Sequence, residues 1–394
     1  MILIAVVFGI CCGIVTGLIP GVHVNLVAIL LVSLGGVFVR WFDPVVVACV
    51  IISTAVTHTF LDVIPSVFLG VPDADMVMSV LPAHKLTLEG RGYEAIRMAT
   101  IGSLLSLLVA LCLFPILVFV VPLLYDYLKA WIGWIILFVV IFLFIREGKW
   151  WAVGLFSLSG MLGLIVLNMV MEQPLLPMLS GLFGVSSLVL ALQDDSILPE
   201  QRITEELIVL PGDLLKCTSA ATLSGWITSM FPGLGSAQAA VLSSVVFRDL
   251  SSHLYLIVVG GINTVNFTLS LVTFYTIEKT RNGAIVAVKD LIGGVTLRQV
   301  LLFCGVALFV GGIATFLAFF LGKKAAKYIG LVPYEMLSYS VMGLVVLLVF
   351  VFSGWIGLLV LFVSSALGML APLLGVARIH LMGCLLAPVL LFFL

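Results

Sequence analysis

Long uninterrupted runs of apolar residues dominate this chain. Runs at 97–123, 150–169 and 300–322 exceed the ~18 residues at which a segment becomes a candidate membrane helix. Continuous runs favour helices over barrel strands, whose apolar residues alternate in segments of ~10. Charged residues make up 9% of the chain, against about 25% in soluble domains. The sequence therefore predicts an all-α polytopic membrane protein, and no basic run points to nucleic acid.

One pattern occurs twice, about half a chain length apart. Residues 13–21 read GIVTGLIPG and residues 225–233 read GWITSMFPG. Each ends in a Pro-Gly pair within an apolar segment, where proline removes a backbone donor and glycine tolerates a positive φ. Broken helices at matching positions of two halves point to a transporter with its substrate site at the repeat interface. For either break alone, a kink satisfied by neighbouring helices is the simpler interpretation.

The order of segments after each break divides the chain into three parts. We predict a first transmembrane repeat at 1–192, a polar linker at 193–216 and a second transmembrane repeat at 217–394. Loops 146–149 and 323–328 are each more basic than their counterparts, so the basic loop changes place between the halves. This favours inverted repeats, each with broken or re-entrant helices at its Pro-Gly motif. The two polar hairpins are both basic and disagree with inversion.

Polar residues follow both Pro-Gly breaks. Helix N-termini freed at such breaks can hold anionic groups, and freed carbonyls can hold cations. We therefore predict that a substrate site includes Pro20, Gly21, His23, Asn25, Pro232, Gly233, Gly235, Ser236 and Gln238.

A polar stretch at 57–66, THTFLDVIPS, interrupts another apolar segment. Ionisable residues at membrane depth are costly and commonly face a cavity or the interior of the bundle. His58 and Asp62 are four residues apart, hence on one face of a continuous helix. The matching stretch of the second half offers the neutral Asn263 and Asn266. We predict that these four residues couple transport to a cation, Na⁺ or H⁺; the alternative is a mutually satisfied pair that only ties helices together.

Signatures of enzymes are missing from the sequence. There is no P-loop, HExxH or GxSxG motif, and the seven cysteines have no metal-ligand spacing. We therefore expect a protein that is not an enzyme and that holds no metal or cofactor beyond a coupling Na⁺.

Three stretches resemble the large membrane subunit (TctA) family of tripartite tricarboxylate transporters. They are residues 13–21, residues 71–103 with the hairpin EGRGYEAI, and FPGLGS at 231–236. The chain resembles a short, divergent member, because Pro20-Gly21-Val22-His23 stands where the family usually has Pro-Gly-Leu-Gly. The resemblance implies ion-coupled uptake of a carboxylate, fed by an extracytoplasmic binding protein and helped by a small membrane subunit.

These observations predict a secondary active transporter for a small organic anion, located in the cytoplasmic membrane and in contact with lipid. They do not decide between a monomer and a homodimer. Two alternatives remain. A polyprenyl-phosphate flippase would favour Arg or Lys within a matched break, and neither break contains one. A structural or assembly protein would use the buried polar residues only to hold helices together.

Overall fold

The chain is helical throughout its described part. The computed structural model describes residues 1–19, 42–70, 76, 78, 80–171, 173–193, 199–203, 209–230, 235–246, 251–280, 282–329 and 334–394. No strand occurs within these ranges, and seven of their helices are long and apolar enough to cross a membrane. The prediction of an all-α polytopic membrane protein is confirmed.

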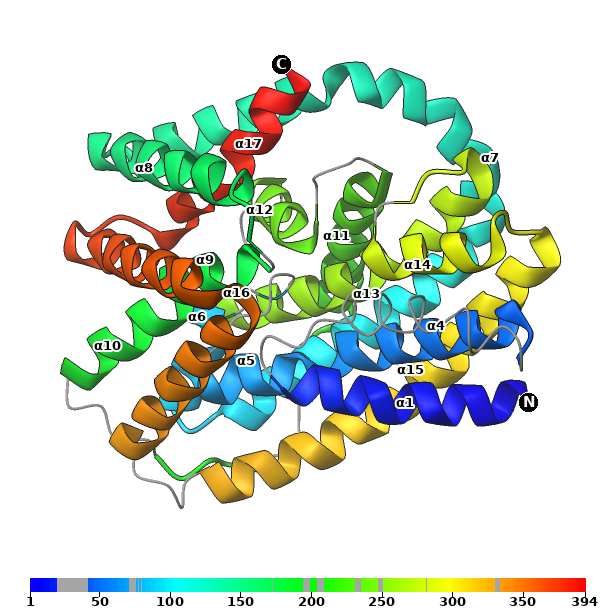
Figure 1. The fold of residues 1–394 in the computed structure, drawn as a ribbon, viewed down its shortest axis with the longest axis horizontal. Coiled ribbons are helices and arrows are strands. Elements are labelled where there is room, and N and C mark those ends of the chain that lie inside the picture. The colour runs from blue at the N-terminus through cyan, green and yellow to red at the C-terminus, as the bar shows by residue number, and fades with distance from the viewer. Residues whose placement is uncertain are drawn as a thin grey trace.

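Helices of both halves are distributed through the whole molecule (Figure 1). The elements of the first half are α1 (Ile2–Leu18), α4 (Pro44–Leu61), α5 (Val63–Leu69), α6 (Val80–Leu88), α7 (Gly92–Glu147), α8 (Trp150–Leu167), α9 (Leu175–Leu179), the π-helix η1 (Ser180–Val185) and α10 (Ser186–Gln193). Those of the second half are α11 (Pro211–Met230), α12 (Ser236–Val246), α13 (Ser252–Ile277), α14 (Gly283–Ile292), α15 (Leu297–Ile329), α16 (Tyr334–Leu373), the 3₁₀-helix η2 (Arg378–Met382) and α17 (Gly383–Phe393).

Local sequence signals set where the two central helices begin. At the start of α4, Pro44 occupies a position whose N–H would have no partner within the helix. The Asp43 carboxylate caps this end by accepting a hydrogen bond from the Val45 N–H at 2.8 Å. Ser251 caps α13 in the same manner, accepting from the Leu254 N–H at 3.3 Å. Both helices therefore start at residues that the sequence makes favourable for capping.

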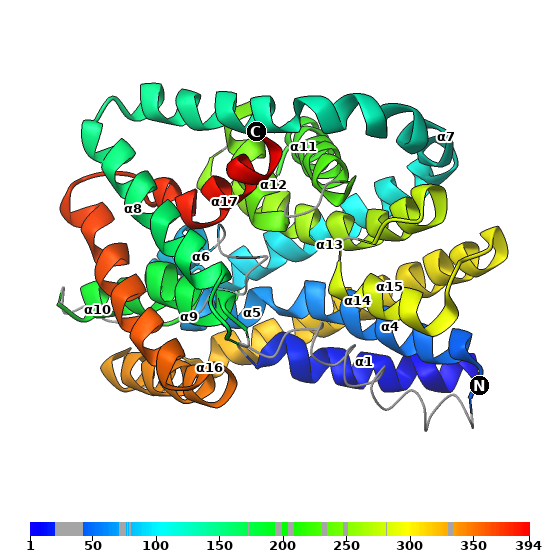
Figure 2. The same cartoon turned by 45° about the horizontal axis from the view of Figure 1, so that its top comes forward.

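Helix α7 contains two candidate membrane spans. The sequence predicts separate spans at 97–123 and 130–145, and the structure has two membrane-length stretches there, Gly92–Tyr125 and Ala130–Glu147, within one helix that contains Pro115 and Pro122. A proline within a helix removes a hydrogen bond and kinks the helix, which need not end there. The later part of α7 turns and runs along the upper edge of the molecule in Figure 2. A sharper break occurs in α16, where Gly354 has a φ of 61°.

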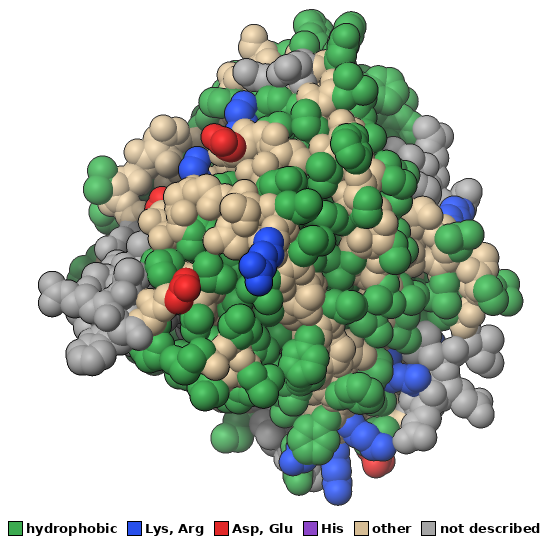
Figure 3. Space-filling view, turned by 90° about the vertical axis from the view of Figure 1, so that its right-hand side faces the viewer, with side chains coloured by type: hydrophobic (Ala, Val, Ile, Leu, Met, Phe, Trp, Pro, Cys, Tyr) green, Lys and Arg blue, Asp and Glu red, His purple; other side chains and the backbone are tan. Residues whose placement is uncertain are grey.

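Helix α13 is the most enclosed of the spans. All of its most apolar stretch is buried inside the protein, against 83% for the span formed by α4 and α5 and 33% for α8. Figures 1 and 2 place α13 in the middle of the molecule. By contrast, hydrophobic side chains cover most of the outer face in Figure 3, with Lys and Arg gathered along its lower edge. Polar side chains on α13 therefore lie within protein and not against lipid.

Glycines place α1 on α4 and α11 on α13 in a similar way. A Cβ on Gly13 of α1 would come within 2.5 Å of the Thr57 Cβ on α4. A Cβ on Gly225 of α11 would come within 2.9 Å of Val265 Cγ1 on α13. Small residues permit this close approach of membrane helices. Gly13 and Gly225 are also the first residues of the two copies of the repeated sequence pattern.

The last segment of each half packs against the other half. A Cβ on Gly163 of α8 would overlap the carbonyl oxygen of Cys384 at the start of α17. A Cβ on Gly368 of α16 would overlap the carbonyl oxygen of Leu182 in η1. Both glycines serve as close crossing points between the halves.

Helices α7 and α15 pack side by side in opposite directions. Ile96 of α7 lies beside Gly322 of α15, where an added Cβ would come within 3.0 Å of Ile96 Cγ2. Further along α7, Leu107 lies beside Gly311. Residue numbers therefore rise along α7 where they fall along α15, although the two helices hold the same place in the order of the two halves.

The polar segment predicted as a linker is partly helical and partly docked on the protein. Helix α11 begins at Pro211, inside the predicted linker 193–216. Gln201 is buried, and its side-chain amide accepts a hydrogen bond from the Gly92 N–H and donates one to the Thr87 carbonyl, both at 2.9 Å. Part of this polar segment is thus docked on the turn between α6 and α7.

Candidate functional site

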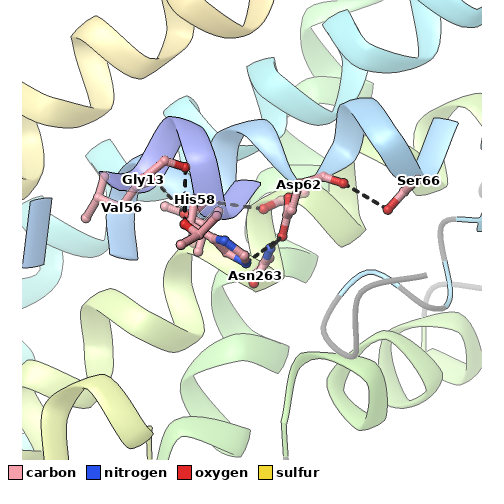
Figure 4. A network of polar contacts seen from close by, with 10 residues as sticks. Gly13, Val56, His58, Asp62, Ser66 and Asn263 are labelled. Atoms are coloured by element: carbon pink, nitrogen blue, oxygen red, sulfur yellow. Dashed lines mark hydrogen bonds and ion pairs between the residues drawn. The ribbon is translucent and has the colours of Figure 1, made fainter. Parts of the chain in front are cut away.

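The polar stretch of α4 lies deep inside the protein. His58 is 4% exposed and Asp62 is 2% exposed, although both are ionisable. The Asp62 N–H donates to the His58 carbonyl at 2.9 Å, so the helical turn that joins them is intact. The two side chains therefore share one helix face, as predicted, and Figure 4 shows them pointing toward the same region.

The Asp62 carboxylate connects the two halves of the chain. Its Oδ2 accepts a hydrogen bond from Asn263 Nδ2 at 2.6 Å, and it lies 4.0 Å from His58 Nε2 (Figure 4). His58 and Asp62 come from α4 of the first half, whereas Asn263 comes from α13 of the second. A carboxylate removed from water requires partners of this kind. The structure thus brings together three of the four residues predicted to couple transport to a cation.

The fourth residue, Asn266, connects α13 to the start of α12. Its Nδ2 donates to Ser236 Oγ at 3.3 Å, and Ser236 is the first residue of α12. The Gln238 side chain accepts a hydrogen bond from the Gly235 N–H at 2.9 Å and so stabilises the start of the same helix. Ser236 and Gln238 are both buried. Pro232 and Gly233 lie outside the described residues.

The first Pro-Gly break lies outside the described residues, together with the predicted contacts Pro20, Gly21, His23 and Asn25. The end of α1 shows where the chain leads into it. A Cβ on Gly17 would come within 2.8 Å of the Leu61 Cβ and 3.4 Å of the Asp62 N. Gly17, three residues before Pro20 in the sequence, thus packs against the backbone of Asp62.

Several buried hydroxyl groups near the centre were not predicted from the sequence. Thr264 Oγ1 on α13 lies 3.4 Å from Thr59 Oγ1 on α4. On α7, Ser103 Oγ donates to the Gly260 carbonyl of α13 at 3.0 Å, and the buried Ser106 Oγ has no hydrogen-bond partner among the described residues. The three-residue spacing of Ser103 and Ser106 in an apolar run is a signal that could have identified this face.

The described residues offer no cluster of three His, Cys, Asp or Glu side chains that could hold a metal ion. The polar groups described around Asp62 are therefore one carboxylate, the imidazole of His58, the amides of Asn263 and Asn266, and several hydroxyls. Such groups can exchange a proton, bind a monovalent cation or orient an anion beside a helix start.

The buried His58–Asp62 pair lies where helices of the two halves meet, and Asn266, bonded to the start of α12, lies one helical turn from Asn263 on α13. Such an arrangement is typical of polytopic membrane transporters. Comparison with known protein families identifies this one. The model of the family described as "Tripartite tricarboxylate transporter TctA family" matches residues 3–383, nearly the whole chain. The chain belongs to this family, which confirms the resemblance drawn from the sequence. Its members are, as the name states, components of three-part tricarboxylate transporters.

A relative in an archaeon shares most of the chain. An uncharacterized protein of Methanocaldococcus jannaschii is 30% identical over 336 residues, which cover 83% of this chain and 80% of the relative. No solved structure matches the chain.

Proposed function

We propose that this protein is the permease subunit of a secondary active transporter that moves a small carboxylate across the cytoplasmic membrane, coupled to Na⁺ or H⁺. One observation carries the proposal. Asn263 and Asn266, three residues apart on α13, join the buried Asp62 carboxylate to the start of α12 at the second Pro-Gly break. These two bonds support an ion site and a substrate site that lie beside the same helix, α13.

We propose further that the two halves are inverted repeats. The matching contacts of Gly13 and Gly225, and of Gly163 and Gly368, support a two-fold relation between the halves. The opposite directions of α7 and α15 support an axis in the membrane plane, because an axis along the membrane normal would leave equivalent spans parallel. Inverted repeats allow two similar conformations that open to opposite sides of a membrane.

The substrate would lie between the two Pro-Gly breaks. The start of α12 supports an anionic substrate, because the first N–H groups of a helix and the helix dipole favour negative charge. In this proposal Gly235, Ser236 and Gln238 shape that start, and Pro232 and Gly233 provide the break before it. The first break, at Pro20 and Gly21, would supply the matching backbone groups from the other half.

The family name supports two partners, an extracytoplasmic binding protein that delivers the carboxylate and a small membrane subunit. The same name favours a carboxylate over the polyprenyl phosphate of a flippase.

The test is thermal stabilisation of the purified full chain in detergent, with citrate, smaller carboxylates and a polyprenyl phosphate, each in NaCl or choline chloride. A ligand at about 100 times its Kd stabilises the folded state by ~2.7 kcal/mol. We expect a carboxylate to raise the melting temperature, and the Gly233→Val variant to lose this shift. A shift produced only by the polyprenyl phosphate would contradict the proposal.

A matched control separates the site from general damage. Gly305 lies in α15 and has nothing within 4 Å of an added Cβ. The Gly305→Val variant should therefore keep the carboxylate shift of the wild type.

A further inference from the structure

The surroundings of the buried carboxylate distinguish between the two candidate coupling ions. Among the described residues, two nitrogen atoms face Asp62 Oδ2: Asn263 Nδ2 at 2.6 Å and His58 Nε2 at 4.0 Å. An amide nitrogen only donates hydrogen bonds, so its hydrogen occupies the position on Oδ2 that a metal ion would need. Hard cations require several oxygen ligands around them. The nitrogens leave Oδ2 suited to gaining or losing a proton and poorly suited to binding Na⁺.

Two nearby hydroxyl groups are engaged with the backbone. Thr59 Oγ1 donates to the Val56 carbonyl at 2.9 Å, and Ser66 Oγ donates to the Asp62 backbone carbonyl at 2.9 Å. Thr57 packs its Cβ and Cγ2 against Gly13 of α1, and its Oγ1 is buried with no hydrogen-bond partner among the described residues. Thr59 and Ser66 therefore do not serve as oxygen ligands beside the Asp62 carboxylate.

On this basis we propose that the coupling ion is a proton and that the His58–Asp62 pair carries it; this inference rests on the proposed transport function. The pair starts as a carboxylate and a neutral imidazole, with a net charge of −1. A proton from water on one side of the membrane binds to the pair and brings its charge to zero. The same proton leaves to the other side, which restores the carboxylate, and no bond between heavier atoms changes.

The charge of Asp62 gives a physical reason for coupling. Asn263 and Asn266 of α13 hold the Asp62 carboxylate and the start of α12 near one another. An anionic substrate at the start of α12 and the negative charge of Asp62 would therefore repel each other. Protonation removes this repulsion, so the proton and the anion each favour the binding of the other. Such coupling between two sites is reciprocal by thermodynamic necessity. Symport of the anion with a proton follows.

The position equivalent to the pair in the second half carries no titratable group. Thr57 and Val265 pack against the matched glycines of α1 and α11, so the next residues, His58 and Asn266, correspond. Four residues further on, Asp62 corresponds to Ser270, whose hydroxyl donates to the Asn266 carbonyl at 2.6 Å. The inference therefore assigns one proton-carrying pair to each chain.

Other titratable groups lie on the helices packed around α4 and α5. They include Cys12 on α1, His84 on α6, Glu94 and Arg97 on α7, Tyr255 on α13, Lys289 and Asp290 on α14, Cys304 on α15 and Glu335 on α16. His84 contacts α5, because its Nδ1 lies 3.4 Å from the Val67 carbonyl. Glu94 forms an ion pair with Arg91, and Asp290 and Glu335 are exposed. Because these three are also carboxyl groups, the Asp62→Asn variant is what assigns the band to Asp62.

The test is infrared difference spectroscopy of the purified full chain, titrated from pH 9 to pH 5 and then exposed to NaCl in place of choline chloride. We expect a carboxylic acid C=O band to grow as the pH falls, to disappear in the Asp62→Asn variant and to be unchanged by Na⁺. Asp43 caps the other end of α4 and is exposed, so Asp43→Asn is the matched control and should keep the band. A band that persists in Asp62→Asn, that never appears, or that is suppressed by Na⁺ would overturn the proposal.

Two further arms keep the result decisive. If Asp62→Asn does not fold, the His58→Gln variant retains the carboxylate and should move the midpoint of the same band by a tenfold or larger change in proton affinity. In proteoliposomes, an inward proton gradient without Na⁺ should drive uptake of labelled citrate. Failure of citrate uptake under every gradient would count against the proposed function, whereas uptake driven by Na⁺ alone would overturn only the proton.

Discussion

Helices α4 and α13 pack against matched glycines, yet they carry different chemistry. Both are central and buried, and both face the other half of the chain. α4 contributes the ionisable His58 and Asp62, whereas α13 contributes the amides of Asn263 and Asn266. The more enclosed of the two helices is the neutral one.

This difference teaches how two similar halves can form one asymmetric site. A single buried carboxylate needs donors, and a neutral partner helix supplies them without adding a second charge. One turn further along the same helix, Asn266 bonds to Ser236 at the start of α12. Placing the charge on one half only keeps the number of ionisable groups at the centre small.

The largest effect is expected when both α4 and α13 carry a carboxylate at this contact. Asn263→Asp would set a second carboxylate against Asp62 at the present 2.6 Å contact. We expect a loss of ~3–5 kcal/mol of stability, because one buried charge then has no compensating partner. Thermal unfolding in detergent at pH 8 measures this loss.

Exchange of the two residues provides the control. The double variant Asp62→Asn with Asn263→Asp restores one carboxylate and one amide at the same contact, and should recover most of the lost stability. A double variant as unstable as Asn263→Asp alone would show that α4 and α13 do not interact through this pair.

The packing of α4 and α13 can be compared through Gly13 of α1 and Gly225 of α11. A Cβ at Gly13 of α1 would come within 2.5 Å of the Thr57 Cβ and 2.7 Å of the Thr54 carbonyl oxygen, whereas a Cβ at Gly225 would come no closer than 2.9 Å to Val265. We therefore expect Gly13→Val to cost about 3 kcal/mol and Gly225→Val about 1 kcal/mol, within the usual range for overpacking. Melting temperatures of the two variants should fall in that order, and the reverse order would contradict the contacts.

The docked linker distinguishes the two halves at the turns before their long helices. Gln201→Ala leaves the Gly92 N–H and the Thr87 carbonyl without this partner, and we expect a loss of ~1–2 kcal/mol. The equivalent turn of the second half is capped within itself, where the Gln299 side chain accepts from the Thr296 N–H at 2.8 Å. Proteolysis near residue 201 should increase in Gln201→Ala and remain at the wild-type rate in Gln299→Ala.

A pH-dependent effect concerns His84, on α6 of the first half. Burial lowers the pKa of His84, so the folded protein holds its imidazole neutral. As the pH falls through ~6.5, the unfolded chain takes up a proton that the folded chain does not. The stability from this residue is complete above that pH and declines below it, by on the order of 1 kcal/mol per pH unit. Melting temperatures of His84→Gln at pH 8 and pH 5 should show a weaker decline than the wild type.

Much of this arrangement could be predicted from residue pattern alone. The apolar runs gave the membrane helices, and the four-residue spacing of His58 and Asp62 gave their shared face. The two halves were paired well enough to place Asn263 and Asn266 opposite them. Each of these inferences depends on a local pattern or on a repeated one.

The remaining features depend on contacts between distant segments. Nothing in the sequence around Gln201 shows that its amide bonds to Gly92 and Thr87. The two spans at 97–123 and 130–145 were predicted, but the sequence does not show that one continuous helix joins them. The Ser103 contact with the Gly260 carbonyl arises where two helices cross, and helix crossings leave only a weak trace in either sequence.

Transport by purified protein in proteoliposomes tests the central claim most directly. With an imposed ion gradient, the wild type should accumulate a labelled tricarboxylate or smaller carboxylate above its external concentration. The Asp62→Asn variant should exchange the same anion across the membrane without accumulating it, because the site that couples the gradient has lost its charge. Equal accumulation by both proteins, or no movement of any carboxylate by the wild type with its partner subunits present, would contradict the account.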